Sequence, residues 1–88
     1  MKPNNYSGRG TVSFSNGESY EVDVHLSFHS SGGFVSGDGR LESDQAFSIG
    51  MNDSGATLIY GGQKIKIVVN KTHIDECHFL TSGPPSAA

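Results

Sequence analysis

The stretch that decides the fold is Tyr20-Glu21-Val22-Asp23-Val24-His25-Leu26-Ser27-Phe28-His29. Apolar residues occupy every even position and polar residues every odd position. Successive side chains of a β-strand point to opposite faces of the sheet, whereas a helix repeats about every 3.6 residues. This strict alternation therefore predicts a strand with one buried and one solvated face.

A second alternating segment comes shortly before this strand. Residues Thr11 to Ser15 alternate in the same way, and Asn16-Gly17 follows them. Asn-Gly tolerates the positive φ angles of tight hairpin turns. Residues 10 to 29 are therefore predicted to form a β-hairpin.

Further short alternating segments continue to the end of the chain, separated by turn-forming residues. The predicted strands are Phe34 to Glu42, Ala46 to Met51, Ala56 to Tyr60, Lys64 to Val69, and a last one around Cys77 to Thr81. The predicted turns are Ser30 to Gly33, Glu42 to Gln45, Asn52 to Gly55, and Gly61-Gly62. Such a regular succession of short strands and turns is typical of all-β domains.

Two segments of this pattern have alternative interpretations. Asp38-Gly39 could be a hairpin turn, but each arm would then have only three or four residues, so a single kinked strand is favoured. Thr72 followed by Asp75 resembles the start of a helix, and Ser82-Gly83-Pro84-Pro85 leaves little room to continue one. A short helical turn is therefore expected near residues 72–77.

The predicted fold is a small antiparallel meander of six to seven strands. A meander of this size buries one face by closing into a barrel or by folding over as a sandwich, and both remain open. The 88 residues are expected to form one domain, 1–88, with loose termini at 1–7 and 82–88.

Composition excludes several classes of protein. A net charge of −3 argues against a nucleic-acid binder, which presents a basic face. No apolar run approaches the roughly 18 residues of a membrane span, and the polar N-terminus lacks a signal-peptide pattern, so a cytoplasmic location is expected. Cys77 is the single cysteine, which excludes an intrachain disulfide and favours a role in core packing.

The inward faces of these strands give the first candidate site. If Tyr20 or Phe28 fills the space left by Gly37 and Gly39, the interior is solid; otherwise a cavity for a small apolar ligand remains. The side chains expected to line such a cavity are Phe14, Leu26, Phe28, Phe47, Leu58 and Tyr60.

Histidines and carboxylates give the second candidate site. Asp23 and His25 share the solvated face of the long strand, and His78 would join them if the last strand lay beside it. These three residues are the predicted metal ligands. A second polar cluster, His73, Asp75, Glu76 and His78, lies near the C-terminal end.

The leading functional hypothesis is a non-catalytic binding or interaction module that needs no cofactor. A thin core and an unpaired sheet edge favour self-association, most simply as a dimer. Its expected ligands are a small apolar molecule or a protein partner, which could add a strand to that edge. The alternative is a small metal-dependent or acid-base hydrolase that uses Asp23, His25 and His78.

Overall fold

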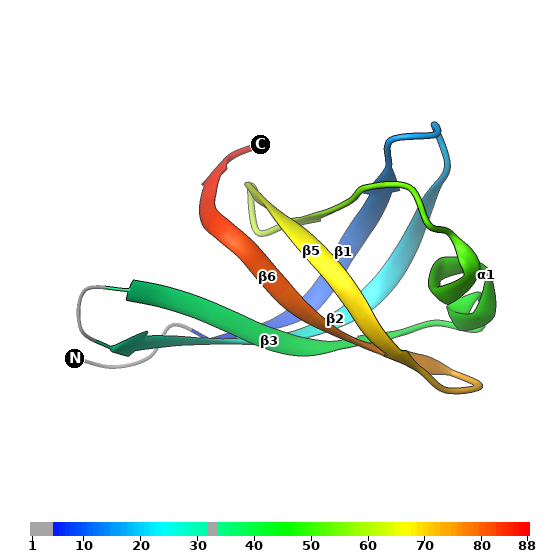
Figure 1. Cartoon of the computed structure of the whole chain (residues 1–88), viewed down its shortest axis with the longest axis horizontal. Helices are drawn as coiled ribbons and strands as arrows, with labels where there is room; N and C mark the ends of the chain where they lie inside the picture. Colours follow the sequence, from blue (N-terminus) through cyan, green and yellow to red (C-terminus); the bar gives the residue numbers. More distant parts are fainter. Residues whose placement is uncertain (1–4, 32–33) are drawn as a thin grey trace.

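A computed structural model describes residues 5–31 and 34–88 of the chain. In this part of the chain, antiparallel strands form a closed barrel in the order β1-β2-β3-β6-β5-β4, and one short helix, α1, lies between β3 and β4 (Figure 1). The all-β prediction is confirmed, with the barrel as the observed alternative. The elements are β1 (Asn5–Phe14), β2 (Ser19–Ser31), β3 (Phe34–Glu42), α1 (Ala46–Met51), β4 (Ala56–Tyr60), β5 (Gln63–Thr72) and β6 (Glu76–Ala87).

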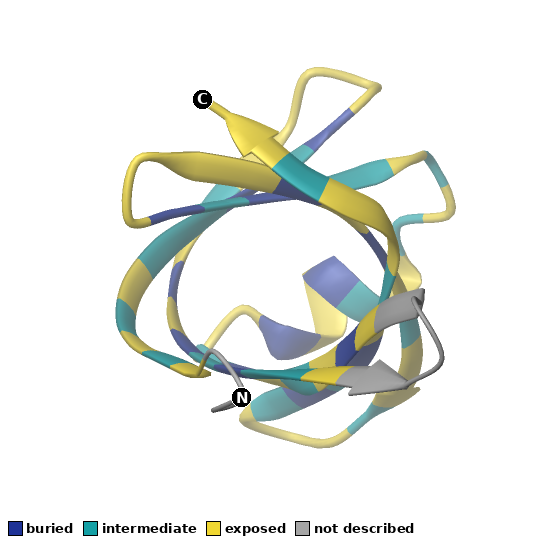
Figure 2. Cartoon of the chain, turned by 90° about the vertical axis from the view of Figure 1, so that its left-hand side faces the viewer, coloured by how far each residue is buried: buried dark blue, intermediate teal, exposed yellow. Residues whose placement is uncertain are grey.

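The strand order joins two meanders into one barrel. Consecutive strands pair within β1-β2-β3 and within β4-β5-β6, and the pairs β3–β6 and β1–β4 close the ring. The connection from β3 to β4 is therefore the only one between the described strands that joins non-adjacent strands. It contains α1, which packs against β5 and β6. Figure 2 looks along the barrel and shows α1 lying across its far end.

The predicted hairpin over residues 10 to 29 is confirmed. β1 and β2 pair around Asn16-Gly17, and Gly17 has a φ of 97°. The turn between β4 and β5 is also as expected, with φ angles of 51° and 78° at Gly61 and Gly62. β3 is one strand, as favoured above. The turn predicted for residues 30 to 33 includes residues 32 and 33, which lie outside the described residues.

Residues 46–51 form a helix, so the strand predicted there is wrong. Ala46 and Ile49, three positions apart, are both buried, and only a helix puts such residues on one face. The buried Cys77 thiol lies 3.2 Å from the Ala46 carbonyl oxygen, to which it donates a hydrogen bond. A Cβ at Gly50 would overlap the Thr72 hydroxyl, so the missing side chain permits close packing against β5. This short segment fits both the two-residue period of a strand and the period of about 3.6 residues of a helix. Burial of Ala46 and Ile49 against the end of the barrel selects the helix.

The helical turn expected near residues 72–77 is likewise wrong. β5 continues to Thr72 and β6 begins at Glu76, so residues 73–75 only connect two strands. The backbone N–H of His73 donates a 2.7 Å hydrogen bond to the Glu76 carbonyl oxygen and closes this hairpin. Pairing with a neighbouring strand therefore outweighs the weak helix-start signal of the sequence.

Regular strand structure extends into both segments that were expected to be loose. β1 begins at Asn5, and β6 continues to Ala87, which pairs with Gln63. The register between β5 and β6 shifts between Lys64 and Lys66, beside Pro84 and Pro85. Irregular pairing of this kind accommodates prolines, which have no N–H to donate.

Aromatic side chains fill the barrel at the two glycines of β3. A Cβ at Gly37 would lie 3.0 Å from the Phe28 ring, and one at Gly39 would lie 3.0 Å from the Phe79 ring. Phe28, one of the two side chains considered above, thus lies against Gly37, whereas Phe79, which was not considered, lies against Gly39. The buried core consists of Val12, Phe14, Val22, Val24, Leu26, Leu41, Ala46, Ile49, Leu58, Tyr60, Ile65, Ile67, Cys77 and Phe79.

Candidate functional site

Polar side chains gather on the outer face of β2, β3 and β6. The register places His25 opposite Arg40, and Arg40 opposite His78. In the adjacent row it places Asp23 opposite Glu42, and Glu42 opposite Glu76. The residues between them along each strand, such as Val24, Leu41 and Cys77, are buried, so strand alternation turns both polar rows outward.

The three predicted metal ligands each have a separate partner. Asp23 forms a 3.2 Å ion pair with Arg9. His25 Nε2 lies 3.0 Å from Glu42 Oε1, and its Nδ1 lies 3.0 Å from the Ser7 hydroxyl. His78 Nε2 lies 2.6 Å from Glu76 Oε2.

The strand order explains why these ligands are apart. β3 lies between β2 and β6, so two strand spacings, about 10 Å, separate the backbones that carry His25 and His78. Both histidines line an open hollow of about 450 Å³ over β3, together with Arg40 and Lys71. Asp23 does not line this hollow. Two of the three predicted ligands therefore face one hollow, but they are farther apart than the ligands of a single ion.

A tighter group forms at the hairpin between β5 and β6. One ligand atom from each of His73, Glu76 and His78 lies within 4.8 Å of the other two. The imidazole rings of His73 and His78 meet edge to face, with their centroids 5.3 Å apart. The hydrogen bond from His78 lowers the pKa of the Glu76 carboxyl below its ordinary value, and the nearby His73 and Arg40 add to this.

This group was visible in the sequence as a polar cluster but was not chosen as the metal site. Glu76 and His78 are two residues apart on a strand and therefore share a face. The hairpin that returns His73 to the same place was obscured by the helical turn expected there. The spacing His-x-x-Glu-x-His across a tight turn is the signal that would have identified it.

The residues predicted to line an apolar cavity fall into two sets. Phe14, Leu26, Leu58 and Tyr60 belong to the core, and Phe28 packs against it partly buried. Phe47 lies on α1 with 59% of its surface exposed, outside the barrel. Phe28 and Tyr60 also line a hollow of about 420 Å³ that includes Tyr6, whose ring centroid lies 5.1 Å from that of Tyr60. Binding of an apolar ligand stays a prediction.

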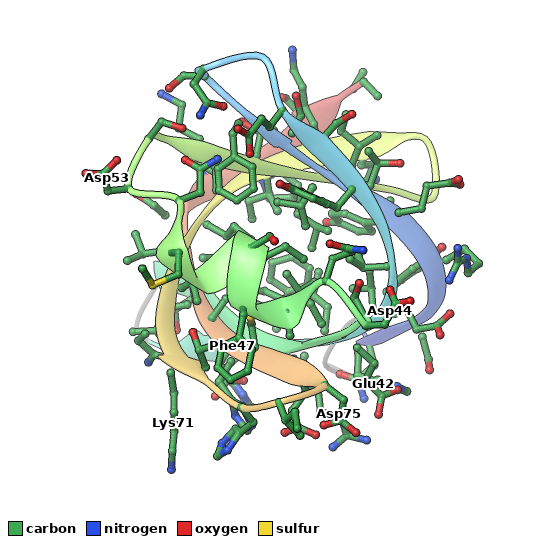
Figure 3. The ribbon with its side chains drawn as sticks, turned by 90° about the vertical axis from the view of Figure 1, so that its right-hand side faces the viewer. Glu42, Asp44, Phe47, Asp53, Lys71 and Asp75 are labelled. Carbon is green, nitrogen blue, oxygen red and sulfur yellow. The ribbon has the colours of Figure 1, made fainter. Side chains whose placement is uncertain are left out.

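Exposed apolar side chains concentrate at the end of the barrel that α1 covers. Phe47 and Met51 are 59% and 82% exposed, and their spacing of four residues puts them on one face of the helix. Ile74, 75% exposed, lies in the adjacent hairpin. A 2.9 Å hydrogen bond from the Ser43 N–H to the Asp75 carbonyl oxygen ties this hairpin to the connection between β3 and α1. We call this region the helix-end surface: Phe47, Met51 and Ile74 with the flanking Asp44, Asp53 and Asp75. Figure 3 shows Phe47 beside the hairpin, with Asp44 and Asp75 on one side of it and Asp53 on the other.

The sequence did not indicate the helix-end surface because residues 46–51 were expected to form a strand. In a strand, Phe47, Ile49 and Met51 would all point inward. The helix instead buries Ile49 and turns Phe47 and Met51 to the solvent.

Cys77 has no exposed surface, and burial raises the pKa of its thiol. As the pH rises, the unfolded chain therefore loses the thiol proton before the folded chain does. The free energy of unfolding is expected to fall above about pH 8.5, the ordinary thiol pKa, and to be independent of this thiol at lower pH. Urea unfolding at pH 7 and pH 9.5 measures the change. Cys77→Ala should remove most of this dependence, and an unchanged pH dependence in that variant would contradict it.

Comparisons with protein-family models, with curated proteins and with solved structures found no match to this chain. Among residues 5–31 and 34–88, no helix has the length and apolar character needed to cross a membrane.

Proposed function

We propose that this protein is a non-catalytic interaction module that binds a protein partner through the helix-end surface. The observation that carries the proposal is the clustering of Phe47, Met51 and Ile74. They are three of the five large apolar side chains that are exposed in the described part of the chain, and they share one end of the barrel. Grouped apolar side chains in a polar rim are typical of docking surfaces, whereas single exposed ones are common everywhere.

The charge of the helix-end surface indicates the chemistry of the partner. Asp44, Asp53 and Asp75 flank the apolar side chains, and none of them has a cationic group within 4 Å among the described residues. A partner segment with apolar side chains flanked by lysine or arginine would complement both features. Glu42 and Lys71 also lie on this side of the molecule (Figure 3), so the surface has an excess of carboxylates over cations. A second copy of this chain would therefore bring mainly like charges together, and we favour a basic segment of another protein.

Synthetic peptides test this proposal directly. Two peptides carry the same pair of leucines, flanked by lysines in one and by glutamates in the other, and binding is followed by fluorescence anisotropy. The protein is expected to bind the lysine-flanked peptide about tenfold more tightly, a difference of about 1.4 kcal/mol. Phe47→Ala should weaken this binding, whereas Leu80→Ala should not, because Leu80 is also exposed, at 48%, but lies on β6 and does not line the hollow that contains Asp53.

Two outcomes would overturn the proposal. One is the absence of any preference for the lysine-flanked peptide, or a preference that Phe47→Ala leaves unchanged. The other is a dimer in sedimentation equilibrium that Phe47→Ala dissociates, because a second copy would then occupy the surface. Self-association was expected from an unpaired sheet edge, and the closed ring of strand pairs weakens that motive.

A further inference from the structure

The hairpin between β5 and β6 holds three metal-binding side chains in one place. Thr72 and Cys77 are cross-strand partners, and the His73 N–H bonds the Glu76 carbonyl oxygen at 2.7 Å. This pairing fixes the backbone positions of His73 and Glu76 relative to each other. Cys77 is fully buried, so its neighbours Glu76 and His78 both point outward from β6.

From this arrangement we propose that His73, Glu76 and His78 bind one divalent transition-metal ion, with Zn²⁺ as the best fit. Two imidazoles and a carboxylate are a ligand set that Zn²⁺ accepts, with bonds of about 2.0 to 2.2 Å. Ligand atoms on a tetrahedral ion lie about 3.4 Å apart by that geometry. The three atoms already lie within 4.8 Å of one another, so side-chain rotation alone can close the site.

The hydrogen bond between Glu76 and His78 is compatible with this site. Glu76 Oε2 and His78 Nε2 are 2.6 Å apart, so a hydrogen bond with one proton joins them. Metal ligands must be free of such protons, so the ion would take the place of this one and the proton would pass to solvent.

Neighbouring charges act on the ion in both directions. Arg40 on β3 and Lys71 on β5 lie opposite His78 in the register and oppose a bound cation. Glu76 supplies one negative charge directly. Glu42 lies opposite Glu76, and its carboxylate is 3.9 Å from the Arg40 guanidinium. Glu42 therefore offsets the positive charge of Arg40.

Three protein ligands leave one position of a tetrahedral ion open. Such sites hold water or a ligand from another molecule in the fourth position, whereas purely structural zinc sites use four protein ligands. Ile74 and Asp75 lie between His73 and Glu76 in the sequence. A bound ion would therefore also restrict the motion of these two residues of the helix-end surface. Metal binding itself does not depend on the proposed partner.

Isothermal titration of the untagged, full-length protein with ZnCl₂ tests the proposal. One Zn²⁺ per chain is expected to bind, and His73→Ala or His78→Ala should weaken binding about tenfold or more, since each removes one of three ligands. Titration with Co²⁺ should give the visible absorption of a low-symmetry, four-coordinate ion, which a loosely bound surface ion would lack. Circular dichroism melting curves confirm that each variant is folded.

His25→Ala and His29→Ala are the matched controls, because both histidines lie on the outer face of the barrel but outside this group. Both variants should bind Zn²⁺ as the wild type does. If His25→Ala abolishes binding while His73→Ala does not, the ion lies between His25 and His78 instead and the proposal is wrong. Absence of saturable Zn²⁺ binding by the wild type would also overturn it.

Discussion

Phe79→Ala is expected to lower the free energy of unfolding by about 3–5 kcal/mol, as for other buried phenylalanines. Phe79 is 1% exposed and pairs with Gly39 on β3 and Val69 on β5. Its ring occupies the space that Gly39 leaves free, so truncation opens a cavity where the neighbouring residue has no side chain to fill it. Since domains are usually stable by about 5–15 kcal/mol, this loss would be a large fraction of the total. Urea unfolding followed by circular dichroism measures it.

Phe47→Ala removes the same side chain from an exposed position and serves as the control. Phe47 is 59% exposed on α1, so its loss should change the free energy of unfolding by no more than about 0.5 kcal/mol. If Phe79→Ala is already unfolded without urea, Phe79→Leu gives a smaller and measurable loss of about 1 kcal/mol. Equal stability losses for Phe79→Ala and Phe47→Ala would contradict the buried position of Phe79 described above.

The strands were predictable wherever alternation and turn residues agree. β3 and β4 have the predicted bounds, and the hairpin at Asn16-Gly17 is as expected, because each signal is local. Residues 46–51 were not predictable, since six residues can satisfy a period of two and a period of three to four at once. What selects the helix is the open barrel end that Ala46 and Ile49 cover, and that end exists only after distant strands have paired.

The candidate sites show the same division between local and distant information. Glu76 and His78 share a face by simple alternation, so their proximity could be read from the sequence. Whether His78 meets His25 or His73 depends on which strands are neighbours, and alternation carries no information about strand order. β3 separates His78 from His25, and the hairpin returns His73 to it.

The glycines of β3 give a graded test of the same packing. A Cβ at Gly39 would overlap the carbonyl oxygen of His25 on β2, and a backbone atom cannot rotate away as a side chain can. Gly39→Ala must therefore push β2 and β3 apart, and we expect it to cost about 1–3 kcal/mol or more. A Cβ at Gly37 would lie 3.0 Å from the side chains of Phe28 and Thr81, which can shift, so Gly37→Ala should cost less.

Gly55→Ala is the matched control, because its Cβ would meet only the Ser15 hydroxyl, at 3.7 Å. Its effect should be near zero or slightly stabilising, since alanine reduces the freedom of the unfolded chain. Thermal and urea unfolding of the three variants should therefore rank the losses as Gly39→Ala, then Gly37→Ala, then Gly55→Ala. If the loss of stability depended only on the glycine being inside a strand, Gly37→Ala and Gly39→Ala would lose the same amount. A larger loss at Gly37 than at Gly39 would mean that side-chain crowding, and not the approach of the β2 backbone, requires glycine in this strand.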